Sequence, residues 1–184
     1  MAELHSSYPV AVRWTGGKTG VASAPDGLPD LEVGSPPQFG GPGGRWTPEH
    51  FFVGAATLCW LTTFLASASL SKLEVAAVEA SGEGAVERGE DRRFSISRIV
   101  LRPRVTIHRE EDREKAVKLI EKAEAACLVA RSMKSEVVLE PEVVVGGGGG
   151  GGPGPPPGGW GGGPPPDGVA ALHEGLLGDG RASG

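Results

Sequence analysis

The sequence has little cysteine and no cluster of metal-ligating side chains. Only two of its 184 residues are cysteine, Cys59 and Cys127, and they stand 68 positions apart. Two cysteines are too few for a disulfide-rich secreted scaffold, and their spacing is not that of zinc ligands. The four histidines are scattered along the chain. We therefore expect no metal site and no bound cofactor.

Positive charge is not in excess, and aromatic residues are few. The formal net charge is −5, and aromatic residues make up 5% of the chain. The basic residues are mixed with acidic ones, and no aromatic residues alternate with them as they would in a base-stacking surface. We therefore do not expect a nucleic-acid partner.

The chain also lacks the features of a secretory signal. Residues 1–7 are polar and too short for one, so we expect a cytoplasmic protein. The uncharged run 51–70 is long enough to raise a membrane span as an alternative. Only eight of its twenty residues are Phe, Leu or Val, and a glycine, three threonines and two serines interrupt them. This composition favours a buried helix and no membrane partner; recovery of the protein without detergent would exclude the span.

Glycine and proline are concentrated at the C-terminus. Residues 146–184 contain 18 glycines and 7 prolines among 39 residues. Such a segment buries too little apolar surface to offset the entropy lost on ordering. We expect one folded domain over residues 1–145 and a disordered tail over 146–184.

The N-terminal region has the pattern of a small sheet. Val10, Val12 and Trp14 alternate with other residues, which predicts a strand with one buried face. The expected elements are a strand over 10–14, a glycine-rich hairpin turn over 15–20, a return strand over 21–23, a short strand over 31–33 and a loop over 34–44.

A long helix is predicted next, over residues 46–70. Thr47 can cap the first free N–H groups, Pro48 suits the first helical position, and Glu49 complements the positive end of the helix dipole. Apolar or small residues then cover nearly the whole circumference, which predicts a helix buried on most sides. Cys59 lies in its middle, where a plain core-filling role is the alternative to chemistry.

The remaining segments predict strands and an amphipathic helix. We expect strands over 73–80 and 94–108, a turn over 82–91, a helix over 112–133 and a last strand over 135–145 with Pro141 at an edge. A bulge or edge is expected where the alternation changes phase after Ile96 and at Pro103. The apolar face of the second helix comprises Ala116, Leu119, Ile120, Ala123 and Cys127. This order predicts an α+β fold with helices on an antiparallel sheet.

Taken together, the motifs resemble the OsmC and Ohr family of cysteine-based hydroperoxide reductases. They are a TGG turn at residues 15–17, a glycine-rich loop, TPE at 47–49, Cys59 ten residues after Glu49, and AExxC ending at Cys127. The match covers about residues 8–145. The resemblance implies an OsmC-like α+β fold with a long buried central helix, and an intertwined homodimer.

The resemblance also implies a thiol peroxidase acting on organic, fatty-acid-type hydroperoxides. Cys59 would be the attacking thiolate, Cys127 the resolving thiol, and Glu49 part of the site. The resulting disulfide would be reopened by a dithiol reductant, either a lipoyl protein or a thioredoxin-like protein. The alternative is a weakly active or inactive family member that binds a small hydrophobic ligand in the dimer cleft.

The chain departs from the family at the arginine that would stabilise the thiolate. Lys18 stands where an Ohr-like arginine would follow the hairpin glycines, and Gln38 stands where an OsmC-like arginine would lie. Lys18 is thus the nearest candidate cation, with Arg13 and Arg45 as further candidates. Leu128 stands where proline commonly follows the second cysteine.

Helix geometry limits how Glu49 can act. Ten helical positions separate Glu49 from Cys59, a rise of about 15 Å. The two cannot touch on one straight helix. If they act in one site, either the helix breaks or a second subunit supplies Glu49, and the intertwined homodimer that the resemblance implies agrees with the second option. A role in complementing the helix dipole is an equal alternative for this residue.

Overall fold

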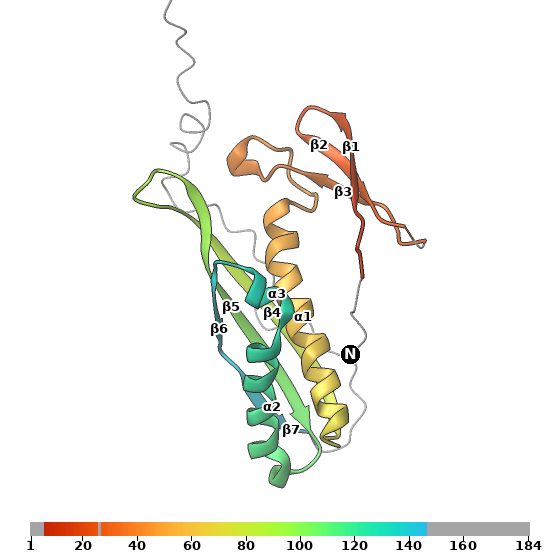
Figure 1. The fold of residues 1–184 in the computed structure, drawn as a ribbon, viewed down its shortest axis with the longest axis vertical. Coiled ribbons are helices and arrows are strands. Elements are labelled where there is room, and N and C mark those ends of the chain that lie inside the picture. Colours follow the sequence, from red (N-terminus) through yellow and green to blue (C-terminus); the bar gives the residue numbers. More distant parts are fainter. Residues whose placement is uncertain (1–5, 26, 147–184) are drawn as a thin grey trace, which may run out of the picture. The chain divides into compact units, whose positions relative to one another are not determined.

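The structure is a computed structural model that describes residues 6–25 and 27–146. The described residues form two compact units, the first ending at Phe51 and the second beginning at Phe52 (Figure 1). The tail predicted over 146–184 lies outside the described residues except for Gly146.

The first unit is a three-stranded antiparallel sheet. Its strands are β1 (Ala11–Gly16), β2 (Thr19–Ser23) and β3 (Leu31–Gly34), in the order β1-β2-β3 (Figure 1). The turn between β1 and β2 has positive φ at Gly16 and Gly17, a conformation that glycine adopts without steric cost. The predicted hairpin and third strand are confirmed. A 3-10 turn, η1 (Pro37–Phe39), follows.

The predicted burial of one face of β1 is wrong. Val10, Val12 and Trp14 are all exposed, Trp14 to 73%. The alternation does place them on one side of the strand, but β1 is an edge strand and the sheet of this unit is a single layer. The alternation of apolar residues correctly predicted that these side chains share one face of the strand, but it carries no information on whether another element covers that face.

The long helix α1 (Pro48–Leu70) begins as the sequence predicts. The His50 N–H donates to Thr47 Oγ1 at 3.4 Å, and the Thr47 N–H donates to His50 Nδ1 at 3.2 Å. This reciprocal pair resembles a capping box with histidine in place of the usual glutamate. The predicted cap at Thr47 is confirmed.

The expectation that α1 is buried on most sides is wrong. Its fully buried residues are Ala56, Trp60, Phe64 and Ala68, which are spaced four apart and form one stripe. The opposite side is uncharged yet exposed, with Leu58 at 61%. α1 is long and apolar enough to cross a membrane, with 22% of its most apolar window buried.

The second unit is built on the hairpin of β4 (Val75–Arg88) and β5 (Phe94–Ile107) (Figure 1). β4 continues through Gly82 and Gly84, so the predicted turn over 82–91 is wrong. These glycines are in the strand because α1 passes close over them. A Cβ at Gly82 would overlap Thr57 Oγ1, and one at Gly84 would lie 2.8 Å from Val53 Cγ2.

A bulge interrupts the hairpin where the alternation changes phase. Gly84 pairs with Ile99 whereas Val86 pairs with Ile96, so three steps on β5 oppose two on β4. The predicted irregularity after Ile96 is confirmed. Pro103 is not at an edge, because β5 is paired on both sides.

The final segment forms two short strands instead of one. β6 (Glu136–Leu139) and β7 (Glu142–Val145) both pair with β5 in parallel, at residues 98–101 and 104–107. The sheet is therefore mixed, not purely antiparallel as expected. Pro141 lies in the break between the two strands, and Pro103 lies in the matching gap of the β5 ladder.

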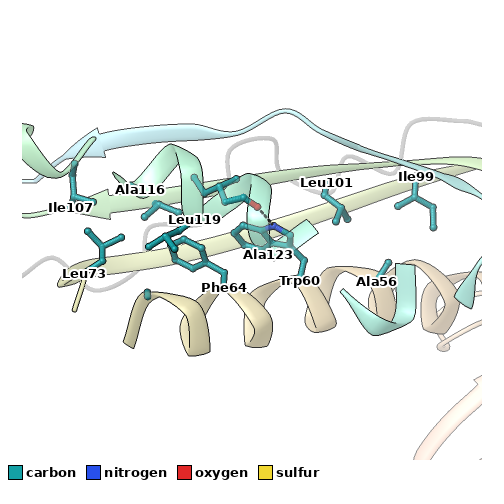
Figure 2. Packing of buried hydrophobic residues seen from close by; sticks show 13 residues of the cluster. Ala56, Trp60, Phe64, Leu73, Ile99, Leu101, Ile107, Ala116, Leu119 and Ala123 are labelled. Atoms are coloured by element: carbon teal, nitrogen blue, oxygen red, sulfur yellow. Dashed lines mark hydrogen bonds between the residues drawn. The ribbon is translucent and has the colours of Figure 1, made fainter. Parts of the chain in front are cut away.

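Both helices pack on one face of this sheet. The buried odd-numbered residues of β5 meet α1 and the apolar face of α2 (Arg113–Ala126), which follows the 3-10 turn η2 (Glu110–Asp112) (Figure 2). Trp60 Nε1 donates to the Ile120 carbonyl at 3.3 Å, which satisfies the buried indole N–H, and Trp60 stacks on Phe64 (Figure 2). The core apolar face predicted for the second helix is confirmed.

The other face of the sheet carries charged side chains. Arg102 pairs with Glu83 and Glu140, each at 2.8 Å, and Arg104 pairs with Glu142 at 3.3 Å. One sheet face meets helices and the other presents ion pairs, so the unit has two layers. This is the predicted α+β class.

Candidate thiol site

Cys127 lies at a break that the sequence did not predict. The expected single helix over 112–133 is two helices, α2 ending at Ala126 and α3 spanning Leu128–Ser132. Between them Cys127 has an extended backbone, with φ −64° and ψ 112°. Its sulfur caps α3, because the Ala130 N–H donates to Cys127 Sγ at 3.4 Å. No proline or glycine marks this break.

The break brings the two cysteines together. The side chain of Cys59, midway along α1, lies near enough to the side chain of Cys127 for each thiol to shift the pKa of the other. Both are free thiols. Cys127 is buried, with 1% of its surface exposed, whereas Cys59 is partly exposed. The site therefore has one sulfur that a solute can approach and one behind it.

Neighbouring dipoles lower the pKa of Cys59. Burial on its own would raise this pKa, but four hydrogen-bonding groups together outweigh it. They are the Val129 backbone N–H, the Cys127 thiol, the Thr63 hydroxyl and the Leu128 backbone N–H. The first turn of α3 thus supplies two of the groups that favour the Cys59 thiolate.

The pKa of Cys127 moves in the opposite direction. Burial raises it most, and the nearby sulfur of Cys59 raises it further by hydrogen bonding and by charge. Backbone N–H groups of Ala130 and Val129 oppose this only in part. The pair therefore favours a thiolate at Cys59 and a neutral thiol at Cys127 that donates to it.

The predicted cations lie in the first unit. Lys18 Nζ donates to the Phe39 backbone carbonyl, and Arg45 pairs with Glu32 at 3.7 Å. Arg13 and Gln38 are exposed, on β1 and η1 respectively. The groups that shift the Cys59 pKa all belong to the second unit, and none of them is a basic side chain. A thiolate-stabilising role for any of these four residues stays a prediction.

Glu49 is in the first turn of α1 and is partly buried. Its Oε2 is buried without a hydrogen-bond partner, and no other side-chain oxygen or nitrogen in the described residues is so placed. A buried carboxylate oxygen without a donor is costly, so the position favours a hydrogen-bond donor at this oxygen. The rise of about 15 Å along α1 separates it from Cys59.

Three contributors to the site were missed in the sequence: Thr63, Leu128 as a backbone donor, and Val129. Thr63 carries a usable signal, because it lies four residues after Cys59 and hence on the same helix face. The backbone groups of Leu128 and Val129 are placed by the helix break at Cys127, and no residue pattern in the sequence predicts this break. Within the described residues, no group of three His, Cys, Asp or Glu side chains could hold a metal ion.

The second unit combines a two-layer α+β architecture with two neighbouring thiols, one of them on its long helix. Residues 41–142 match the family model described as OsmC-like protein. The chain belongs to this family, and the resemblance predicted from its motifs is confirmed.

Individual relatives agree with this assignment. The uncharacterized protein YmaD of Bacillus subtilis is 29% identical over 145 residues, covering 77% of this chain and 95% of that protein. An OsmC-like protein of unknown function from Vibrio cholerae has the same fold, with a TM-score of 0.68 at 21% identity, covering 74% of this chain and 99% of that one. An organic hydroperoxide resistance protein OsmC from Legionella pneumophila has a TM-score of 0.60 at 22% identity, covering 78% and 100%.

Proposed function

We propose that this protein is a thiol-dependent peroxidase that reduces organic hydroperoxides. The observation that carries the proposal is the proximity of a partly exposed Cys59, whose pKa is lowered, to a buried Cys127, whose pKa is raised. A nucleophile needs the thiolate form and access to solute, and a resolving thiol needs proximity and its proton. Each sulfur has the properties that one of these roles requires.

The reaction would use the two sulfurs in turn. The Cys59 thiolate attacks the terminal oxygen of the hydroperoxide; an S–O bond forms, the O–O bond breaks, and the departing alkoxide takes a proton from solvent. Cys59 is then a sulfenic acid, and condensation with the Cys127 thiol releases water and forms a disulfide. A dithiol of the lipoyl or thioredoxin class reduces the disulfide by exchange and is itself oxidised.

The surroundings of Cys59 favour an organic substrate. Leu128, whose side chain is 72% exposed, directly follows the resolving cysteine, and its backbone N–H reaches Cys59. Phe52 and Ala66 lie two turns before and after Cys59 on the same side of α1, and both are exposed and uncharged. An apolar group attached to the hydroperoxide would therefore find apolar surface beside the reacting sulfur.

The proposal extends to a homodimer in which Glu49 of one subunit completes the site of the other. Two observations support it: the unpartnered Glu49 oxygen, and the apolar, exposed side of α1 around Leu58. Large uncharged faces of this kind mark association sites in proteins that do not enter membranes. A cytoplasmic location is part of the same proposal.

The test is peroxide consumption by the full-length protein, with cumene hydroperoxide as substrate and dithiothreitol as reductant. Wild type should turn over many equivalents. Cys59→Ser should be at least about 100-fold slower, because no nucleophile remains. Cys127→Ser should form a sulfenic acid at Cys59 with one equivalent of peroxide and then depend on external thiol. Ser69→Ala, an exposed change on the same helix, should match wild type. Undiminished turnover by Cys59→Ser would reject the proposal.

A second candidate is a non-catalytic member of the family that binds a small hydrophobic ligand. It is favoured by the absence of a basic side chain among the groups that act on Cys59. It predicts inertness towards peroxides. Stoichiometric formation of a Cys59–Cys127 disulfide on adding one equivalent of cumene hydroperoxide would contradict this second candidate, and mass spectrometry of the unreduced protein measures it.

A further inference from the structure

The helix α3 (Leu128–Ser132) is held in place by few interactions. It has five residues, none of them buried, and is far shorter than helices that are stable on their own. The residues on either side of it are fixed instead. Cys127 is 1% exposed, and Met133 packs against the core of the second unit. α3 is therefore a segment that can unwind locally while the elements around it stay folded.

The start of α3 depends on a sulfur atom. The Ala130 N–H donates to Cys127 Sγ at 3.4 Å, and the Arg131 N–H donates to the Cys127 carbonyl at 3.1 Å. Cys127 has the extended backbone of an N-cap residue, so its sulfur takes the place where a serine, threonine or aspartate oxygen usually satisfies a free N–H. Sulfur is a weak acceptor, so a small movement of this atom is enough to remove the cap.

The proposed function requires the same sulfur to bond elsewhere. A disulfide holds its two sulfurs about 2.05 Å apart, well inside the contact distance of two free thiols, so at least one of them moves when the bond forms. Cys59 is fixed by α1, whose neighbouring turns bury Ala56 and Trp60 in the core. Cys127 lies in a break between two helices. Its sulfur is therefore the one that is freer to move.

We propose that α3 is a redox-sensitive element, capped by Cys127 in the dithiol form and released when Cys127 joins Cys59 in a disulfide. This rests on the proposed function in so far as these two residues form the disulfide. Bond formation removes two protons and two electrons from the thiols, and the hydroperoxide accepts them. It turns the Cys127 sulfur away from the Ala130 N–H, which is left to water. Reduction restores the thiol and the cap.

Release of α3 gives the dithiol reductant access to the disulfide. A thiolate of the reductant attacks the Cys127 sulfur, a mixed disulfide forms, and Cys59 departs as a thiolate. The second thiol of the reductant then closes the reductant's own disulfide and expels Cys127, which takes up a proton. Attack at Cys127 expels the thiol with the lower pKa, which is the better leaving group. Since Cys127 is buried in the dithiol form, this route requires α3 to open.

The test compares the two redox forms of the full-length protein without using peroxide. Tris(2-carboxyethyl)phosphine gives the dithiol form and diamide, a thiol oxidant, gives the disulfide form, which intact mass spectrometry checks by the loss of two hydrogens. NMR follows hydrogen–deuterium exchange of the Ala130 and Arg131 amides, and trypsin cleavage after Arg131 gives a second readout. Cys59→Ser keeps the cap without the disulfide, Cys127→Ser replaces the sulfur by a hydroxyl cap, and Cys127→Ala removes the cap.

In wild type, the Ala130 and Arg131 amides should exchange about three- to tenfold faster in the disulfide form, since a helix cap is lost. Amides of α2 such as that of Leu119 should not change. Cys59→Ser and Cys127→Ser should not respond to diamide, and Cys127→Ser should be at least as protected as the dithiol form. Cys127→Ala should exchange as fast as the disulfide form under both conditions. If it does not fold, Cys127→Ser carries the comparison.

Three results would overturn the proposal: equal exchange in the two forms of wild type, a Cys127→Ala protein as protected as dithiol wild type, or no Cys59–Cys127 disulfide with diamide. Failure of the proposed function is a separate result. In that case diamide releases α3, but wild type consumes no cumene hydroperoxide.

Discussion

At the scale of single residues, the two thiols differ because of which groups point at them. Both are shielded from water to some degree, and burial alone would move both pKa values upward. Backbone groups of the first turn of α3, a thiol and a hydroxyl lower the pKa of Cys59, whereas burial and the neighbouring Cys59 raise the pKa of Cys127. Fixed dipoles thus separate two chemically identical groups, as charged side chains do in other thiol sites.

This asymmetry makes a prediction about stability and pH. An unfolded cysteine titrates near its ordinary value of 9.0, and folding lowers the pKa of Cys59. Its ionisation therefore stabilises the folded state at pH above 9.0, and this contribution is lost as the pH falls through the folded-state pKa. The free energy of unfolding of wild type minus that of Cys59→Ser should increase as the pH rises towards 9.0. Urea unfolding at several pH values, with a reductant present, measures it.

The raised pKa of Cys127 gives the free energy of unfolding the opposite dependence on pH. Its contribution is full below 9.0 and is lost as the pH rises from 9.0 through the folded-state pKa. Measurements for the Cys59→Ser comparison are therefore best kept at or below pH 9. A difference between wild type and Cys59→Ser that stays flat, or falls, over that range would contradict the lowered pKa of Cys59.

The residues of the site were only partly predictable. Cys59 and Cys127 followed from motif order and periodicity, and in the structure the two thiols lie near enough to shift each other's pKa. A cation beside Cys59 was expected because an ionised sulfur in an apolar place needs stabilisation. The dipoles observed there come from backbone N–H groups, whose direction depends on tertiary structure and leaves no trace in residue type. Thr63 alone could have been found, from its spacing.

At the scale of elements, α1 lies very close to β4 at two glycines, Gly82 and Gly84. Gly82 faces Thr57 and Val53 of the helix, and a Cβ at this position would overlap the Thr57 hydroxyl and lie 3.1 Å from Val53 Cγ1. The helix can lie this low only because the strand has no side chain there. The distance between α1 and the sheet also affects how far Cys59, on α1, lies from Cys127, between α2 and α3.

Gly82→Ala should therefore destabilise the protein. Overpacking of this kind costs about 1–3 kcal/mol, which for a domain of this size lowers the melting temperature by several degrees. Gly89→Ala is the matched control, because it makes the same change in the exposed turn after β4, where the nearest atom is an Asp91 side-chain oxygen and not a packed helix. Thermal unfolding followed by circular dichroism compares the two. Equal melting temperatures of the two variants would contradict this prediction, because they would show that α1 moves away from β4 without loss of stability.

Element prediction succeeded where local chemistry decides the outcome. The β1–β2 turn, the Thr47 cap and the apolar stripe of α2 were predicted because glycine, a capping hydroxyl and periodicity act within a few residues. The turn over 82–91 was predicted wrongly because its glycines serve helix packing. The parallel pairing of β6 and β7 was missed because strand direction is set by where α2 and α3 return the chain, which alternation does not encode.

At the scale of the whole molecule, the side of α1 that faces away from the sheet is the largest unexplained surface. It has no charged residue from Phe51 to Leu70, and Leu58 and Leu65 are both exposed on it. A helix that is apolar on all sides is normally covered on all sides. In the proposed homodimer the second subunit provides that cover.

The dimer predicts a specific response to charge. Wild type should sediment at about twice the 18.9 kDa of one chain. Leu58→Glu should sediment near the mass of a single chain, because a carboxylate buried at an apolar interface lacks a partner. Lys122→Glu, a charge change on the exposed side of α2, should remain dimeric. Analytical ultracentrifugation without detergent measures all three. A monomeric wild type would contradict the homodimer, and wild type that is recovered only with detergent would favour the membrane alternative.

The helix break at Cys127 bears on how long the oxidised enzyme would survive. In the proposed cycle, the sulfenic acid on Cys59 is the one vulnerable species, since a second molecule of peroxide converts it to sulfinic acid, which thiols cannot reverse. The proposed resolving sulfur already lies near Cys59 before any substrate arrives, so we expect condensation without unfolding of α2 or α3. A protein with this arrangement should tolerate a sudden excess of oxidant. The same excess would inactivate a protein in which a conformational change must bring the second cysteine to the first before the disulfide can form.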